Sequence, residues 1–344
     1  MTLPENPTFG NLENISVRQP MTISPEAKKW FPIPEPGEVN VKARLRLEDI
    51  TIPNNVVEDL QRYVQHVLSI HSGYSKDSPD GVIIGLSGGI DSSTVATLLD
   101  QTLKQGGARY HFKGIILGRA PTGEEGEMNS VEIEDIKTAH QFAQDMNLDY
   151  EYLDISSLIK EFYKLFPKST EWELSGVLPR IRFAVLQQYA DNNNFLLADP
   201  TNFTEWSLAA FTSSGSVGSV GPLVDLYKSE VFALGKKLGV PDYVLQKKPA
   251  ISELGIYDEQ LYGGNCFILD PIIKRLVSDF KTPREIADEL GHSVNWINRI
   301  KKLRIEGESA RKTPPLAIFN ERYIIVHPPI GKLDRSYFDR IGER

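Results

Sequence analysis

The sequence predicts an α/β protein built on a doubly wound parallel sheet, with flanking helices and a helical C-terminal region. Short apolar segments alternate with longer amphipathic segments between residues 81 and 238, a pattern typical of a parallel sheet crossed by helices. The first of these segments, residues 81–86, is apolar throughout, as expected of a strand buried on both faces. In such folds ligands bind beyond the carboxyl ends of the strands, so a ligand site is expected there.

The N-terminal residues 1–53 are expected to form an extended, proline-rich arm. Seven prolines between residues 4 and 36 prevent regular helices there. The arm is either disordered or lies on a partner subunit. The core elements then follow in order. Strands are expected at residues 81–86, 111–117, 150–153 and 195–198, and helices at residues 54–71, 91–103, 131–146, 155–166, 177–189 and 228–238.

The C-terminal part is expected to be helical from about residue 270, followed by a tail at residues 317–344. Thr282, Pro283 and Glu285 form a capping-box pattern, which marks a helix start. Gly291 is expected to end that helix and Ser293 to cap the next one. The pair superficially resembles a DNA-binding helix-turn-helix. We favour an ordinary packing hairpin, because the whole chain is acidic.

Composition excludes several classes of function. The chain has 344 residues, with 38 Lys and Arg against 46 Asp and Glu, so its formal charge is −8 and we expect no nucleic-acid partner. One cysteine excludes an intrachain disulfide and a metal site built on several cysteines. No apolar run reaches the length of a membrane span, and the first residues do not resemble a signal peptide. We therefore expect a cytoplasmic protein that does not interact with membranes.

The sharpest motif is a phosphate-binding loop, Ser-Gly-Gly-Ile-Asp-Ser, at residues 87–92. It follows an expected strand and opens an expected helix, where backbone N–H groups form an anion site. Gly88 and Gly89 allow the backbone to approach phosphates closely, while Ser87 and Ser92 add hydroxyl groups. Asp91 would repel polyphosphate unless a cation lay between them, which makes this carboxylate a candidate Mg²⁺ ligand.

This loop resembles the pyrophosphate-binding loop of the N-type ATP pyrophosphatases, and other segments resemble the ammonia-dependent NAD synthetase family in particular. The resemblance covers a domain at residues 54–316 and implies an adenine nucleotide alpha hydrolase-like, Rossmann-like fold. Thiolating members of the wider group usually bring cysteines, so a single distant cysteine favours amide formation. The matching segments lie at residues 119–123, 179–182, 202–205, 222–228, 258–259 and 311–315.

The resemblance implies roles for individual residues. Asp91, Glu205 and Lys228 would be catalytic, with Asp91 and Glu205 holding Mg²⁺. Arg119 would contact ATP or merely fix its loop, and Arg180 and Arg311 would approach an anionic acyl substrate or form ordinary ion pairs. Lys228 would contact the ATP phosphates, unless it is simply a solvated lysine at a helix start. The full set expected to bind ATP is Gly85, Ser87, Gly88, Gly89, Asp91, Ser92, Arg119 and Lys228, and the set expected to bind substrate is Arg180, Asn202 and Arg311.

The chain also departs from the family pattern where the family contacts its substrates. Ser213 stands where the family uses a lysine, and Val220 or a neighbour stands where it uses an aspartate. Ala250 replaces a threonine that contacts ATP, and Ala310 replaces a histidine that faces the substrate. Pro200 replaces a threonine near ATP. Despite this change and that at Ala250, the residues expected to serve adenylation are largely kept, whereas those expected to recognise the substrate are changed.

We therefore expect an ATP-dependent amide-forming ligase that adenylates a carboxylate, releases pyrophosphate and transfers ammonia or an amine. The carboxylate is either deamido-NAD or a different acid used by a paralogue with altered specificity. A nucleotide-binding pseudo-enzyme is a third hypothesis, disfavoured because Asp91 and Glu205 are both retained. About 80 residues precede the phosphate loop, too few for a glutaminase domain, so ammonia would be free or supplied by a partner. The family resemblance also implies a homodimer.

Overall fold

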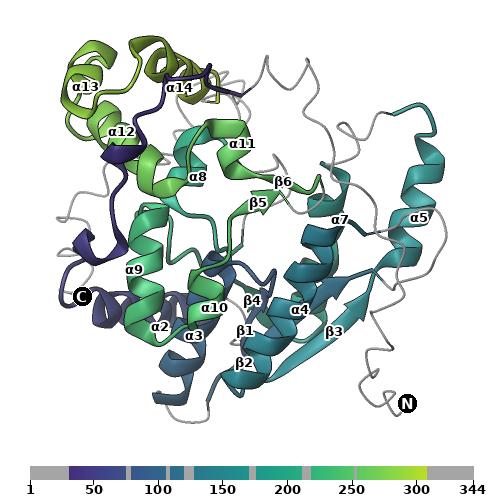
Figure 1. The fold of residues 1–344 in the computed structure, drawn as a ribbon. Coiled ribbons are helices and arrows are strands. Elements are labelled where there is room, and N and C mark those ends of the chain that lie inside the picture. The colour runs from purple at the N-terminus through teal and green to yellow at the C-terminus, as the bar shows by residue number, and fades with distance from the viewer. Residues whose placement is uncertain are drawn as a thin grey trace, which may run out of the picture. The chain divides into compact units, whose positions relative to one another are not determined.

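Four parallel strands form the central sheet of the computed structural model, in the order β3-β2-β1-β4 (Figure 1). The structure describes residues 31–74, 79–105, 109–119, 128–169, 176–210, 218–251 and 254–307, all within the compact unit Met1–Arg311. From β1 the chain first adds β2 and β3 on one side and later adds β4 on the other side. The carboxyl ends of β1 and β4 therefore form the topological switch point of the sheet. The strands are β1 (Gly81–Gly85), β2 (His111–Gly118), β3 (Tyr150–Asp154) and β4 (Phe195–Leu197), each within one residue of its expected bounds.

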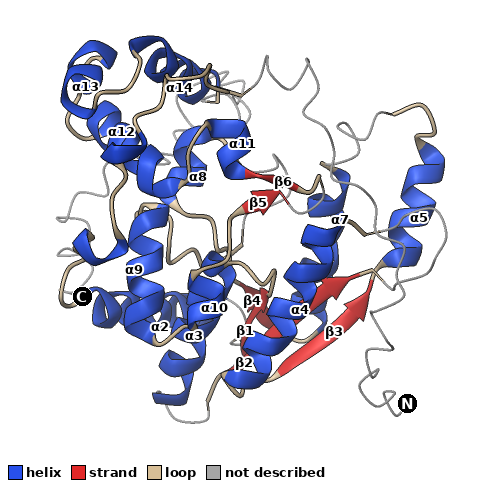
Figure 2. Ribbon diagram, viewed as in Figure 1, coloured by secondary structure: helices blue, strands red, loops and turns tan. Residues whose placement is uncertain are grey.

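Helices cover both faces of this sheet, as the doubly wound prediction requires (Figure 2). Val82 and Ile84 on β1 pack in one core with α2, α3, α4 and α9, while Ile83 packs on the other face with α5 and α7. This alternation explains why the first strand is apolar at every position. The helices are α2 (Val56–Tyr74), α3 (Ile90–Gln105), α4 (Ser130–Asp145), α5 (Ser156–Leu165), α7 (Val177–Asn192) and α9 (Lys228–Leu238).

A third core joins the helices of the C-terminal part. It is centred on Trp296, which is fully buried and donates from its indole nitrogen to the backbone oxygen of Tyr262 at 3.1 Å. The caps expected from the sequence are confirmed: Thr282 accepts from Glu285 N, and Gly291 ends its helix with φ +72°. The helix α10 (Asp242–Leu245) packs instead on the core shared by α3 and α9. The elements of the third core are α8 (Phe203–Leu208), α11 (Asp258–Tyr262), α12 (Cys266–Val277), α13 (Pro283–Leu290), α14 (Val294–Glu306) and the hairpin of β5 (Ala250–Ile251) with β6 (Ile256–Tyr257).

Residues 31–45 lie on these C-terminal helices of the same chain, and residues 47–50 pack against α9. Asn40 N donates to His292 Nδ1 at 2.9 Å, and the Asn40 amide donates to Leu290 O at 2.7 Å. Glu38 accepts from Ser293 and forms an ion pair with Arg299. Two short 3₁₀ turns, Val41–Ala43 and Leu47–Asp49, interrupt the extended backbone expected there. The remaining part of the expected arm, residues 1–30, lies outside the described residues, as does the tail.

Within the described ranges, no helix combines the length and apolar character needed to cross a membrane. The hairpin of α13 and α14 buries Ile286 on the first helix and Ile297 and Ile300 on the second in the third core. These two helices therefore contribute apolar side chains to the packing of the C-terminal part.

Candidate active site

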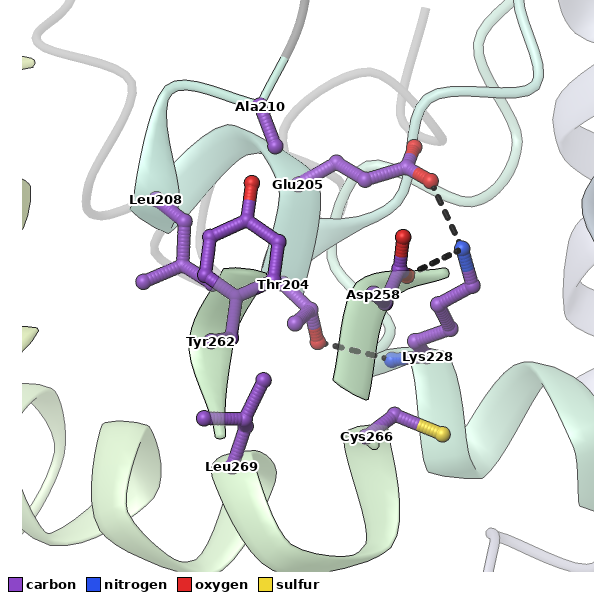
Figure 3. Close-up of a pocket in the computed structure, with 9 residues that line it drawn as sticks. All are labelled: Thr204, Glu205, Leu208, Ala210, Lys228, Asp258, Tyr262, Cys266 and Leu269. Atoms are coloured by element: carbon purple, nitrogen blue, oxygen red, sulfur yellow. Dashed lines mark hydrogen bonds and ion pairs between the residues drawn. The ribbon is translucent and has the colours of Figure 1, made fainter. Parts of the chain in front are cut away.

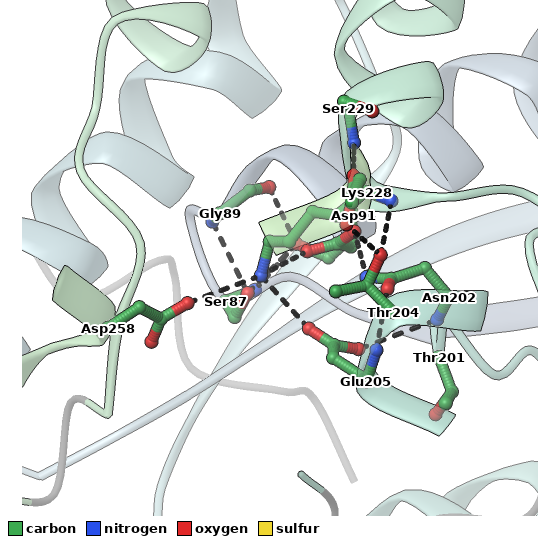
Figure 4. Close-up of polar contacts among 12 residues, drawn as sticks. Ser87, Gly89, Asp91, Thr201, Asn202, Thr204, Glu205, Lys228, Ser229 and Asp258 are labelled. Carbon is green, nitrogen blue, oxygen red and sulfur yellow. Dashed lines mark hydrogen bonds and ion pairs between the residues drawn. The ribbon is translucent and has the colours of Figure 1, made fainter. Parts of the chain in front are cut away.

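The phosphate-loop motif lies between β1 and α3, as its sequence predicts. Gly88 has φ +75°, a left-handed conformation that favours glycine. The Ser87 and Ser92 hydroxyl oxygens are 3.0 Å apart, and Ser92 Oγ donates to Gly89 O at 3.2 Å. Gly89 N donates to Ser87 Oγ at 3.3 Å (Figure 4). The loop is therefore organised by its own hydrogen bonds, with backbone N–H groups gathered at the start of α3, where anions bind favourably.

Lys228 is the centre of a charged cluster next to this loop. Its Nζ lies 3.3 Å from Asp91 Oδ2, 3.0 Å from Glu205 Oε1 and 4.0 Å from Asp258 Oδ2 (Figure 4). The lysine side chain is only 11% exposed. Three carboxylates surrounding one ammonium leave an excess of negative charge, so the cluster attracts a further cation.

Asn202 connects the two acids predicted to bind Mg²⁺. It is fully buried and caps α8, accepting from Glu205 N at 3.0 Å, while Glu205 Oε2 accepts from Asn202 N at 3.4 Å. The Asn202 amide also donates to Asp91 Oδ1 at 2.8 Å. One side chain thus fixes the start of α8 and orients the loop carboxylate, although the segments are more than a hundred residues apart in sequence.

A second buried acid fixes the backbone from which Lys228 projects. Asp270 on α12 accepts from Thr204 Oγ1 at 2.6 Å and from Ser229 N at 2.7 Å. Thr204 Oγ1 in turn accepts from Lys228 N at 2.9 Å. Burial raises the pKa of Asp270 to about 6, with these hydrogen bonds opposing the increase. The first turn of α9 is therefore tied to both α8 and α12.

Electrostatics in the cluster follow from burial and from charge balance. Withdrawal from water raises the pKa of Glu205 to about 7; Lys228 opposes this increase and Asp91 adds to it. Burial alone would lower the pKa of Lys228, but the three carboxylates together raise it well above its usual value. Lys228 is therefore a permanent cation, whereas Glu205 changes charge near neutral pH.

A small pocket opens beside the cluster (Figure 3). Lys228, Glu205 and Asp258 contribute its polar side, and the other walls are largely apolar. Burial raises the pKa of the Tyr262 hydroxyl and holds the pKa of the Cys266 thiol well above its usual value, so both stay neutral. The lining residues are Thr204, Glu205, Leu208, Ala210, Lys228, Asp258, Tyr262, Cys266 and Leu269.

The carboxylates of Asp91 and Glu205 fit a magnesium ion. Both have an oxygen within 3.3 Å of the same lysine nitrogen, so one cation already sits between them. In the part of the chain that the structure describes, no three acid, histidine or cysteine side chains form a metal cluster. A pair of carboxylates completed by phosphate oxygens and water is the usual arrangement for Mg²⁺ at nucleotide sites.

The other predicted site residues have varied positions. Gly85 ends β1, where a Cβ would lie 2.8 Å from the Leu186 side chain, so glycine also lets α7 approach the strand. Arg119 is 6% exposed and forms an ion pair with Glu132 at 2.6 Å, which favours the loop-fixing role over an ATP contact. Arg180 is exposed and donates to Gly176 O at 2.7 Å. Arg311, Ser213 and Ala310 lie outside the described residues, and substrate binding by Asn202, Arg180 and Arg311 stays a prediction.

Two features were not identified as site residues from the sequence. From the sequence, Asp258 was identified only as part of a pair of acids at residues 258–259 that resembles the family. No residue near it in the sequence indicates that it faces Lys228. Lys247 forms an ion pair with Asp135 and donates to Gly88 O at 3.2 Å. Both residues meet their partners only in the folded chain, where segments far apart in sequence come together. No local sequence pattern indicates such contacts.

Comparison with known proteins adds an independent finding. The family model for NAD synthase matches residues 62–314. The NH3-dependent NAD+ synthetase of Thermococcus kodakarensis is 31% identical over 74% of this chain and 96% of that protein, and that of Thermococcus sibiricus is 33% identical over 68% and 87%. Solved structures share the fold: NMN synthetase from Francisella tularensis (TM-score 0.60, 24% identity, 78% of this chain and 100% of that one) and the NH3-dependent NAD synthetase from Campylobacter jejuni (0.58, 24%, 80% and 100%).

Proposed function

The chain belongs to the NAD synthase family, whose members are ATP-dependent carbon–nitrogen ligases that form AMP and pyrophosphate, and we propose that its acyl substrate is the deamidated dinucleotide and its nitrogen donor ammonia. One observation carries the assignment to the site: Lys228 joins Asp91 of the phosphate loop to Glu205 at the switch point of the sheet. This places a fixed cation and two carboxylates where the ATP phosphates are expected.

The chemistry takes place in two steps. A substrate carboxylate oxygen attacks the α-phosphorus of ATP. The bond between this phosphorus and the oxygen that bridges to the β-phosphate breaks, and pyrophosphate leaves. Ammonia then attacks the carbonyl carbon of the acyl adenylate and AMP leaves, while the nitrogen loses one proton to form the amide. The N–H groups at residues 87–92 and the Lys228 ammonium stabilise charge on the phosphates during the first step. Mg²⁺ held by Asp91 and Glu205 would neutralise further phosphate charge.

A related carboxylate is a second candidate for the acyl substrate. Val220 is fully buried and paired with Ala198 at the end of β4, so it offers no ionic contact to a dinucleotide. Ala250 likewise lacks the hydroxyl expected of the family at its position. Loss of buried polar contacts strongly changes the discrimination of polar substrates, which favours testing more than one acid.

The deciding experiment measures pyrophosphate release and amide formation by the purified chain. ATP, Mg²⁺ and ammonium are supplied with deamido-NAD, with the corresponding mononucleotide acid, or with no acyl substrate. Turnover with deamido-NAD at least tenfold above the mononucleotide supports the proposed substrate. Turnover with the mononucleotide alone supports the altered-substrate alternative. ATP binding without pyrophosphate release from any acid would support the nucleotide-binding pseudo-enzyme.

A further inference from the structure

The α4 helix packs against the phosphate loop but carries no residue assigned to the proposed reaction. A Cβ on Gly88 would collide with the backbone oxygen of Asp135 on α4, so helix and loop are in direct backbone contact. The same helix begins at a capping box in which Glu132 also pairs with buried Arg119, at the end of β2. The α4 helix is therefore fixed at its start and pressed against the loop one turn later.

Lys247 completes this contact from a third segment. Its ammonium forms an ion pair with the Asp135 carboxylate and donates to Gly88 O at 3.2 Å. The Lys247 side chain is 9% exposed, and that of Asp135 is 17% exposed. A lysine this deeply buried loses hydration, so both of its contacts matter for keeping it there.

The hydrogen bond to Gly88 O fixes the orientation of one peptide group. In a planar trans peptide the C=O and the following N–H point to opposite sides. Turning Gly88 O toward Lys247 therefore directs Gly89 N to the other side, where it donates to Ser87 Oγ. Gly88 and Gly89 have no Cβ, so no side chain of the two residues opposes a flip of this peptide. A flip would break both hydrogen bonds and present an oxygen to an anion.

We propose that Lys247 and Asp135 are positioning residues for the ATP phosphates: they lock the Gly88–Gly89 peptide so that its N–H, and not its C=O, faces the triphosphate. The proposal rests on the assignment of residues 87–92 to the phosphates, which is part of the proposed function. Both residues act through the loop backbone, and their charges largely cancel each other. The effect is therefore confined to the phosphate part of the nucleotide.

The test compares ATP with adenosine as ligands of the full chain, using calorimetry in the presence of Mg²⁺. Lys247→Met removes the donor, and the double variant K247M/D135N also removes the carboxylate charge that faces Lys247. We expect the ATP dissociation constant to rise about tenfold in both variants, as for the loss of a charged hydrogen bond. The adenosine dissociation constant should stay within about twofold of wild type, because adenosine has no phosphates.

Lys236→Met is the matched control, because Lys236 is an exposed lysine on α9. It should leave both dissociation constants unchanged. Unchanged ATP affinity in a folded K247M/D135N protein would overturn the proposal, and so would an equal loss for ATP and adenosine, which indicates a general structural defect. Nucleotide binding needs no acyl substrate, so failure of amide formation, which tests the proposed function, is distinguishable from failure here.

Discussion

Lys228 is the residue on which the proposed chemistry most depends. It combines a permanent charge with a fixed position, since its backbone and its ammonium are both held by neighbouring segments. Replacement by Met keeps most of the length of the side chain but removes the cation. We predict that Lys228→Met lowers the rate of pyrophosphate release by about 100- to 1000-fold, the usual effect of removing one preorganised group that stabilises charge.

The measurement is single-turnover pyrophosphate release at saturating ATP, with Lys236→Met as the matched control. Thermal unfolding of both variants shows whether the fold is retained. A Lys228→Met protein that is folded and retains more than a tenth of the wild-type rate would contradict the proposed role.

Glu205 gives a prediction about pH. Its pKa is raised to about 7, so the carboxylate is largely protonated at pH 6 and ionised at pH 8. A protonated carboxylate cannot bind Mg²⁺, so the metal concentration for half-maximal activity should rise as the pH falls below 7, by up to about tenfold per pH unit. Mg²⁺ titrations of activity between pH 6 and 8.5 check this. A constant half-saturating concentration across that range would exclude Glu205 as a titrating ligand.

At the scale of elements, residues 31–45 and the α13–α14 hairpin stabilise each other. His292 is 5% exposed, and its Nδ1 accepts the backbone N–H of Asn40. Protonation of that nitrogen would break the hydrogen bond. Burial lowers the pKa of His292, so the unfolded chain takes up a proton at a higher pH than the folded protein does.

This linkage predicts an acid-sensitive contact. Above the ordinary histidine pKa of about 6.5, His292 does not lower the free energy of unfolding. As the pH falls below that value, the histidine lowers the free energy of unfolding increasingly. Between pH 7.5 and 5.5 we expect wild type to lose about 1 kcal/mol more stability than His292→Gln, comparable to one buried hydrogen bond. Denaturant unfolding at both pH values measures the difference. Equal losses in the two proteins would show that His292 does not carry the effect.

For the molecule as a whole, an exposed apolar face on α5 favours the homodimer that the family resemblance implies. Leu158 is 51% exposed, Leu165 71% and the adjoining Phe166 48%. Ile181 and Phe183 on α7 are also only partly buried, although they pack on the core of that face. We propose that a second copy of the chain covers this surface.

The double variant L158E/L165E should therefore be monomeric when light scattering is measured during size exclusion. Phe280→Glu is the matched control, because Phe280 is 83% exposed but lies between α12 and α13. It should leave the mass unchanged. A wild-type protein that is monomeric at micromolar concentration would contradict the dimer, as would a dimer that survives both glutamates.

The sequence predicted the framework better than the connections within it. The strands were predictable because runs such as residues 81–85 are apolar and bounded by turns, and the helix at residues 228–238 because Gly239 ends it. The phosphate loop was predictable because its chemistry is local. By contrast, α8 has six residues, too few for a periodic pattern, and residues 31–45 contact helices some 250 residues away. Asp258 and Lys247 acquire their partners only through tertiary packing.

The wide spacing of the cluster along the chain has a consequence for synthesis on the ribosome. Asp91 emerges first, Glu205 more than a hundred residues later, and Lys228 and Asp258 later still. The parallel pairing of β1 with β4, which joins Gly81 to Phe195, also waits for the second half of the chain. A nascent chain halted before residue 228 therefore has the phosphate loop without its cation. Capture of ATP by nascent chains of increasing length should begin only once that lysine has left the exit tunnel.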